Sequence, residues 1–134
     1  MKKILERAVA LNKEINVFDY AGDIVKALNK GGALLVSEAE DCVNAMTIGW
    51  ATFGVEWGVP IFAVYVREGR FTRELIDRTG EFTVAVPYGE KYSAQVTKAL
   101  GMCGSRSGRD MDKIAKSKKF CYNEKNFGKG GCIE

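Results

Sequence analysis

Residues 44–50 read Asn-Ala-Met-Thr-Ile-Gly-Trp, and they lie at the centre of the pattern that decides the fold. Met46, Ile48 and Trp50 occur at every second position, which is typical of a strand with one buried face. Two interpretations of this stretch stay open. Its amide, its hydroxyl and its small residues would let a planar, polar heterocycle approach the backbone closely. The alternative is an ordinary strand whose large side chains face the core.

Further strands are expected on both sides of this stretch, which itself belongs to a predicted strand over residues 42–52. The run at 61–66 is apolar at every position, so it is predicted to be either a central strand or a strand covered by a second subunit. The other predicted elements of this part are strands at 33–37 and 81–86, a turn at 38–41 and a loop at 53–60.

Apolar residues at helical spacing predict several short helices around these strands. They are expected at residues 2–13, from Asp19 or Asp23 as N-cap to Gly31-Gly32, from Phe71 to Gly80 with Thr72 as a possible cap, over Tyr92 to Leu100, and from Asp110 as cap through Ile114. The strands follow one another too closely for a parallel sheet, which needs long crossovers. We therefore predict a mainly β fold, a mostly antiparallel barrel with helices packed outside it.

Length and charge set limits on the class of protein. The chain has 134 residues, 46% of them apolar and 28% charged, which is ordinary for one globular domain. The net charge of +3 is low for a nucleic-acid-binding protein. No apolar run is long enough to span a membrane, and residues 1–7 do not look like a signal peptide, so we expect a cytoplasmic protein.

The chain has no histidine and four cysteines, and both facts restrict its chemistry. Without histidine, Ser-His-Asp and Cys-His catalysis are excluded, as are most transition-metal sites. Cys42, Cys103, Cys121 and Cys132 form no C-x-x-C pair, so we expect free thiols and no metal. Cys103 is either near a ligand or, more in keeping with its residue type, a buried inert thiol. If the protein is an enzyme, a single acid, amine or thiol acts, or a cofactor carries the chemistry.

Two further segments are candidates for binding an anion. Residues 104–113, Gly-Ser-Arg-Ser-Gly-Arg-Asp-Met-Asp-Lys, precede a predicted helix and place Lys113 in its first turn. A lysine is unfavourable there unless a bound phosphate reverses the sign of the interaction. Residues 67–72, Arg-Glu-Gly-Arg-Phe-Thr, follow a strand and supply Arg67 and Arg70. The alternatives are a solvated loop for the first segment and a capped surface turn for the second.

Taken in order, these segments resemble the signature of the flavin reductase-like family, which includes flavoredoxins. Its Asn-x-Met-Thr-x-x-Trp pattern is met at residues 44–50, and its Arg-aromatic-Thr turn is met at 70–72. Gly-Glu-Phe follows at 80–82, and Ser-Gly-Arg-Asp-x-Asp-Lys follows at 107–113. The likeness extends from about residue 32 to residue 114.

The resemblance implies a fold, a cofactor and a set of site residues. Similar proteins are FMN-binding split barrels that form homodimers with the flavin near the subunit interface. Asn44, Thr47 and Trp50 would line the flavin beside the backbone of Ala45, Met46, Ile48 and Gly49, and Lys113 would meet the phosphate. Arg70, Thr72, Ser107 and Arg109 would lie near the phosphate and ribityl chain. The relatives continue past residue 134 with further strands, so residues 1–134 are expected to be a single domain that is truncated or divergent at its C-terminus.

The resemblance also implies a redox role in which the flavin, and no catalytic side chain, carries the chemistry. Hydride would pass from NADH or NADPH to the flavin, and electrons would then pass to an unknown acceptor. No nicotinamide fingerprint follows a strand, so a non-catalytic flavin-binding or electron-carrier module remains the alternative. A third hypothesis, binding of single-stranded nucleic acid, rests on the basic and aromatic residues Lys116, Lys118, Lys119, Phe120, Tyr122, Lys125, Phe127 and Lys129. A solvated tail fits the modest charge better, and we expect neither nucleic acid nor membrane as partner.

Overall fold

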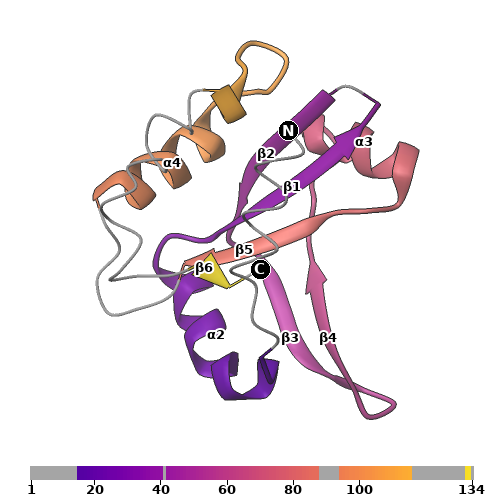
Figure 1. Cartoon of the computed structure of the whole chain (residues 1–134), viewed down its shortest axis with the longest axis vertical. Coiled ribbons are helices and arrows are strands. Elements are labelled where there is room, and N and C mark those ends of the chain that lie inside the picture. Colours follow the sequence, from indigo (N-terminus) through magenta and orange to yellow (C-terminus); the bar gives the residue numbers. More distant parts are fainter. Residues whose placement is uncertain (1–14, 41, 88–93, 116–131, 134) are drawn as a thin grey trace.

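The computed structural model describes residues 15–40, 42–87, 94–115 and 132–133, and it consists of two antiparallel sheets with helices packed against them (Figure 1). The larger sheet has the order β2-β1-β5-β6, and the smaller pairs β3 with β4. The strands are β1 (Ala33–Ala39), β2 (Cys42–Ile48), β3 (Ala51–Glu56), β4 (Val59–Val64), β5 (Thr83–Pro87) and β6 (Cys132–Ile133). The helices are η1 (Val17–Tyr20), α2 (Ala21–Lys30), α3 (Phe71–Thr79) and α4 (Ala94–Ser105), and residues 113–115 are also helical.

The predicted fold class, mainly β and antiparallel with flanking helices, is confirmed. Every strand pair among the described residues is antiparallel. Helices α3 and α4 pack on β1 and β2, whereas α2 contacts β3 and β5. Within the described part of the chain, no ladder joins the two sheets into a closed barrel.

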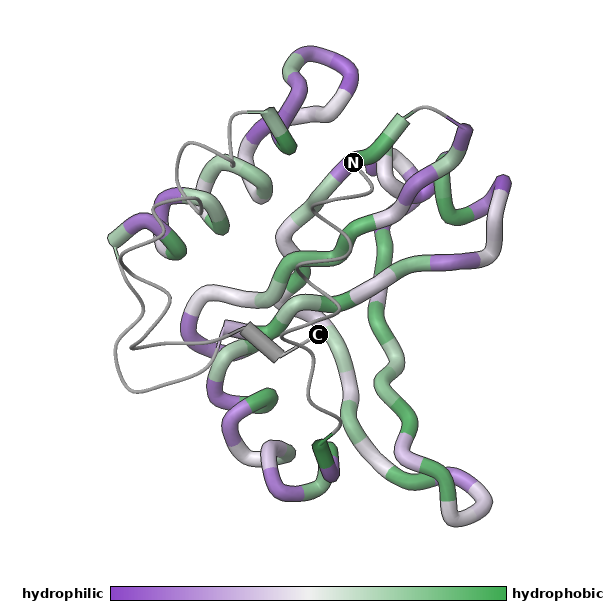
Figure 2. Tube along the Cα trace, viewed as in Figure 1, coloured by the Kyte–Doolittle hydropathy of each residue, from purple (hydrophilic) through white to green (hydrophobic). Residues whose placement is uncertain are grey.

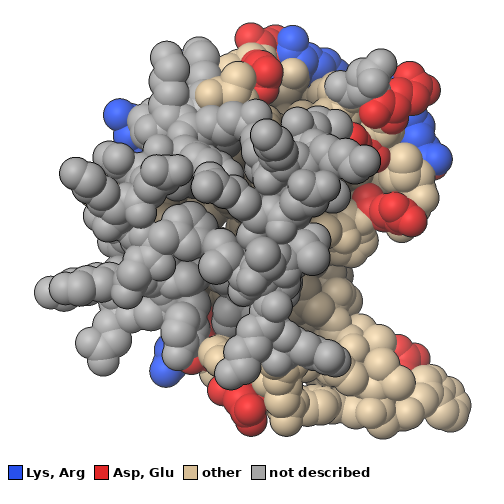
Figure 3. All heavy atoms as spheres, in the orientation of Figure 1, with Lys and Arg blue, Asp and Glu red and all other residues tan. Residues whose placement is uncertain are grey.

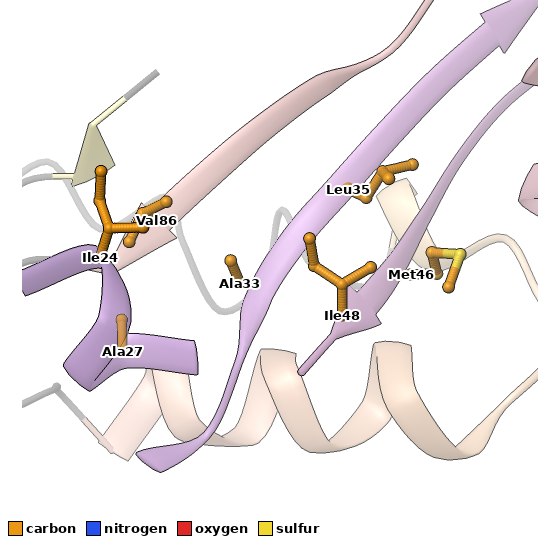
Figure 4. Packing of buried hydrophobic residues seen from close by; sticks show 7 residues of the cluster. All are labelled: Ile24, Ala27, Ala33, Leu35, Met46, Ile48 and Val86. Atoms are coloured by element: carbon orange, nitrogen blue, oxygen red, sulfur yellow. The ribbon is translucent and has the colours of Figure 1, made fainter. Parts of the chain in front are cut away.

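The core lies where α2 meets the larger sheet (Figure 4). Its buried members come from one face of α2 and from three strands, namely Ile24, Ala27, Ala33, Leu35, Met46, Ile48 and Val86. In β1 every second residue is buried, as strand geometry requires for a half-covered sheet. Figure 2 shows apolar residues along β1 and β5, and further apolar residues along the hairpin of β3 and β4.

The predicted loop over residues 53–60 is wrong, because these residues form most of a β-hairpin. Glu56 pairs with Val59, and the connection is made by Trp57 and Gly58, whose φ angles are 54° and 79°. Two successive left-handed residues make a type I′ turn, whose twist matches that of a hairpin. Trp57 is not a usual residue for this turn, which is why the sequence did not signal it. The expected strand over 42–52 also differs from the structure. It is interrupted at residues 49–50, where the chain passes from β2 into β3.

Among the described residues β4 is paired on one side only, with β3, so the run at 61–66 does not form a central strand there. The turn expected at 38–41 is also narrower than predicted. Residues 38 and 39 continue β1, and Ala39 pairs with Cys42. Glu40 has a φ of 56°, so the chain reverses there rather than two residues earlier.

The helices are confirmed where they are described, but their caps differ from prediction. α2 begins after Tyr20 rather than at Asp19 or Asp23, because η1 runs directly into it. Arg70, not Thr72, precedes α3, and Thr72 lies inside that helix. Asp112, not Asp110, caps the helical residues 113–115, accepting a hydrogen bond from the amide of Ala115 at 2.9 Å.

The stop at Gly80 is confirmed, with a left-handed φ of 71° and an amide that donates to Ile76 at 2.7 Å. The predicted helix at 2–13 and the basic tail at 116–131 lie outside the described residues. Among the residues that are described, no helix is long and apolar enough to cross a membrane.

Candidate functional site

Two neighbouring hollows open where β2, the start of α3 and the end of α4 meet. The first has a volume of about 210 Å³. It is lined by Asn44, Met46, Gly69, Arg70, Phe71, Thr72, Ser105, Arg106, Ser107, Gly108 and Lys113. The second has a volume of about 180 Å³ and is lined by Met46, Thr47, Ile48, Gly49, Trp50, Tyr65, Arg67, Arg70 and Gly104.

The two hollows form one elongated site because they share Met46 and Arg70. Each alone is smaller than a small-molecule pocket of about 300–1,000 Å³. The first is polar and cationic. The second is rimmed by Trp50 and Tyr65, which are 68% and 57% exposed. A ligand that spans both would need an anionic end and a flat end.

Lys113 forms the base of the first hollow and is only 3% exposed. Its ammonium donates to the carbonyl oxygens of Ala45 at 3.0 Å and Cys103 at 3.3 Å. Burial lowers the pKa of Lys113 from its ordinary value, the nearby Cys103 raises it, and the positive charge of Arg70 lowers it further. A buried charge normally needs an opposite charge. Here the partners are neutral carbonyls, so an anion in the hollow would complete the site.

Arg70 lines both hollows, and the end of α4 holds its guanidinium in place. Its guanidinium donates to the carbonyl oxygens of Gly104 and Cys103, both at 3.3 Å. These carbonyls belong to the last turn of α4, where helix C-termini leave acceptors free and carry a partial negative charge. The end of α4 thus orients both Arg70 and Lys113. A guanidinium has five donors, so Arg70 keeps donors for a ligand.

The charged side chains that line the hollows are all cationic in the described part of the chain. Among the described residues the lining contains Arg67, Arg70, Arg106 and Lys113, and no aspartate or glutamate. Converging cations in a concave site attract anions and bind phosphate by charge-assisted hydrogen bonds. Among the described residues no cluster of three or more acidic or cysteine side chains could hold a metal.

Asn44 and Thr72 fix the wall between β2 and α3. The Asn44 amide donates to the Thr72 hydroxyl at 2.7 Å, and both residues are buried. Gly108 passes so close that an added Cβ would lie 2.2 Å from the Asn44 side-chain oxygen and 2.7 Å from the ring of Phe71. The glycine in this loop is therefore required by the close approach of its backbone to Asn44.

The structure brings nearly all of the predicted site residues together. Of the predicted set, only Ala45 and Arg109 do not line either hollow. Ala45 is buried and contributes its carbonyl to Lys113. Arg109 pairs instead with Glu74 and covers the ring of Phe71, 5.3 Å from its centroid.

Of the described lining residues, Tyr65 alone lies outside the three segments that the sequence singled out, 44–50, 67–72 and 104–113. Tyr65 lines the site because it lies opposite Trp50, to whose carbonyl its amide donates at 3.1 Å. That pairing depends on the hairpin, which the sequence did not reveal. Cys103 is fully buried, as expected for an inert thiol.

Comparison with known proteins agrees with this fold. No protein-family model matches the chain. The uncharacterized protein YddH of Escherichia coli K12 is 33% identical over 92 residues, which cover 66% of this chain and 46% of YddH. The crystal structure of an FMN-binding domain of a flavin reductases-like enzyme from Shewanella baltica OS155 matches with a TM-score of 0.54 and 24% identity. That match covers 72% of this chain and 49% of the other. The chain thus spans about half the length of both proteins and shares the fold of the second.

Proposed function

We propose that this protein binds FMN in the two hollows and acts as an oxidoreductase that passes electrons from NAD(P)H to an acceptor. The observation that carries the proposal is Lys113, a buried cation whose hydrogen-bond partners in the described part of the chain are carbonyls, at the base of a hollow whose described lining contains no carboxylate. The fold shared with an FMN-binding domain supports it. When bound, FMN would supply the redox chemistry, which a chain without histidine need not supply itself.

The residues of the first hollow fit a phosphate monoester. Lys113 and Arg70 would provide two positive charges for a dianion, and Ser107 would provide a hydroxyl. Asn44 and Thr72 lie beside them and would face the polar chain that joins the phosphate to the ring system. These five side chains come from β2, from α3 with its preceding residue, and from the 106–113 segment. The fold therefore brings them together in the first hollow.

The second hollow fits a flat heterocycle. Gly49 has no side chain, and an added Cβ there would meet nothing nearer than 3.9 Å, so the backbone at the end of β2 is open to close approach. Trp50 offers an exposed aromatic face beside it. Thr47 is engaged, since its hydroxyl donates to the Leu100 carbonyl at 2.6 Å, so it would contribute shape rather than a free donor.

The test is the visible absorption spectrum of the protein after FMN is added and the excess removed. We expect the protein to retain a yellow flavin that bleaches when NADH or NADPH is added anaerobically. Retained colour without bleaching by either nucleotide would contradict the enzymatic part of the proposal and favour the flavin-binding or electron-carrier module. If no flavin is retained, the proposed cofactor is wrong.

We also propose that the protein is a homodimer, with the β3–β4 hairpin in the interface. Cross-strand register places Thr52, Glu56, Val59, Ile61 and Ala63 on one face of the hairpin, and all of them are exposed. Glu56 is the single charged residue of the hairpin, so the projecting arm is almost wholly uncharged (Figure 3). Monomeric proteins rarely leave such apolar patches uncovered. The same face continues into the second hollow through Trp50 and Tyr65.

Replacing Ile61 with glutamate should convert the dimer into a monomer. A charge at the centre of an apolar interface is left unpaired, which raises the dimer dissociation constant by at least about tenfold. The molar mass in solution can be measured by light scattering at micromolar concentration. Val25→Glu is the matched control, because Val25 is equally apolar and 55% exposed but lies on α2. A monomeric wild-type protein, or an Ile61→Glu variant that stays dimeric, would contradict this interface.

A further inference from the structure

The side chain of Arg109 links the segment between α4 and Lys113 to α3. Arg109 forms an ion pair with Glu74, one turn into α3. Its guanidinium carbon also lies 5.3 Å from the centroid of the Phe71 ring. Both contacts are made on the outside of the segment, where Arg109 and Glu74 are about half exposed. The side chain of Arg109 is thus directed to the surface of α3 and not into either hollow.

The inner side of the same segment forms a wall of the first hollow. Arg106, Ser107 and Gly108 line it, next to Ser105 at the end of α4. Two local hydrogen bonds keep the turn compact, from the Arg109 amide to the Ser107 hydroxyl at 3.2 Å and from the Asp110 amide to the Ser107 carbonyl at 3.3 Å. Gly108 lies directly against Asn44 and Phe71. If the segment moved away from α3, the wall would move with it.

We infer that Arg109 is a positioning residue that holds this wall closed, acting through Glu74 and Phe71 and not through contact with a ligand. This role differs from a direct contact with the phosphate or ribityl chain, the region in which the family resemblance implies Arg109. The inference rests on the proposed anion site for its effect on affinity. Its effect on the position of residues 106–110 is independent of any ligand.

The two roles predict opposite effects of removing the Glu74 charge. If Arg109 bound the anion directly, neutralising Glu74 would free the guanidinium and remove a negative charge near the site, so the anion would bind more tightly. If Arg109 positions the wall, the same substitution releases it, and the anion binds more weakly. The sign of the change for Glu74→Gln therefore separates the two roles.

The experiment compares Glu74→Gln, Arg109→Gln and the double variant by titration with FMN and with inorganic phosphate. We expect each single variant to bind about fivefold more weakly, as one partly exposed ion pair with a cation–π contact allows. The double variant should be no weaker than either single variant, because both remove the same contact. Unchanged or tighter binding by Glu74→Gln would overturn the inference.

Hydrogen exchange in the ligand-free variants keeps this test separate from the proposed function. Amides of residues 106–110 should exchange several-fold faster in both single variants than in the wild type, whether or not FMN binds. Asp77→Asn is the matched control, because Asp77 pairs with Arg73 at 2.8 Å on the same helix, at the neighbouring turn. Exchange that is unchanged in Glu74→Gln, or equally faster in Asp77→Asn, would overturn the positioning role even if FMN binds.

Discussion

Replacing Lys113 with methionine should weaken FMN binding by about thirtyfold, the effect of losing one charge-assisted hydrogen bond in a buried site. Methionine keeps the length and apolar body of the side chain, so the hollow should keep its shape. The lost group is the ammonium that donates to the carbonyls of Ala45 and Cys103. Fluorescence titration of FMN measures the change.

Lys26→Met is the matched control for this substitution. Lys26 is a lysine on α2 with an 81% exposed side chain that pairs with Asp23 and lines neither hollow, so its loss should leave FMN affinity unchanged. An unaltered affinity in Lys113→Met would show that the phosphate does not bind at this lysine. A circular dichroism melt of both variants separates lost binding from lost folding.

The pH dependence of binding gives the same test an independent readout. Because burial lowers the pKa of Lys113, its ammonium is lost at a lower pH than that of an exposed lysine. FMN affinity of the wild type should therefore fall as pH rises through that lowered pKa, and Lys113→Met should lack this fall. In the ligand-free protein, the contribution of Lys113 to the free energy of unfolding changes with pH in the opposite direction to FMN affinity. Between the lowered pKa and the ordinary lysine value the unfolded chain binds more protons, so this group makes stability rise with pH.

The elements that the sequence predicted correctly are those decided by local patterns. The strand at 33–37 is bounded by glycine and charge, and α3 ends at Gly80, which is suited to a left-handed residue. The hairpin of β3 and β4 was missed because Trp57 occupies a left-handed position without the usual asparagine or glycine signal. The apolar run at 61–66 did predict residues 61–64 of β4, but residues 53–56 of β3 and 59–60 of β4 fell in the predicted loop.

The sequence predicted which residues form the candidate site, but not which contacts they make. Residues 44–50 and 104–113 were selected by residue type, and the fold brings them to the same pair of hollows. The partners of Lys113 are carbonyls on β2 and α4, 68 and 10 residues away, and no local pattern contains them. The direction of Arg109 depends in the same way on where α3 places Glu74. Contacts between distant elements follow from packing, which sequence periodicity does not describe.

Replacing Gly32 with alanine should lower the free energy of unfolding by about 3 kcal/mol and the melting temperature by about 10 °C. Gly32 joins α2 to β1 with a φ of 91°, where a side chain is strained. An added Cβ would also lie 2.4 Å from the backbone oxygen of Ile48 and 2.9 Å from Thr47, and backbone cannot move aside without shifting β2. Thermal or urea unfolding measures the loss.

Gly22→Ala is the control for this prediction, because the same substitution should stabilise the protein at that position. Gly22 lies on the exposed side of α2 with nothing within 4 Å of an added Cβ, so alanine should raise stability there by about 0.5–1 kcal/mol through helix propensity. The same substitution is thus expected to have opposite signs ten residues apart. Because Thr47 and Ile48 line the second hollow, Gly32→Ala should also weaken FMN binding, and Gly22→Ala should not. Equal stability of the two variants would mean that α2 does not join β1 through a left-handed residue packed against β2.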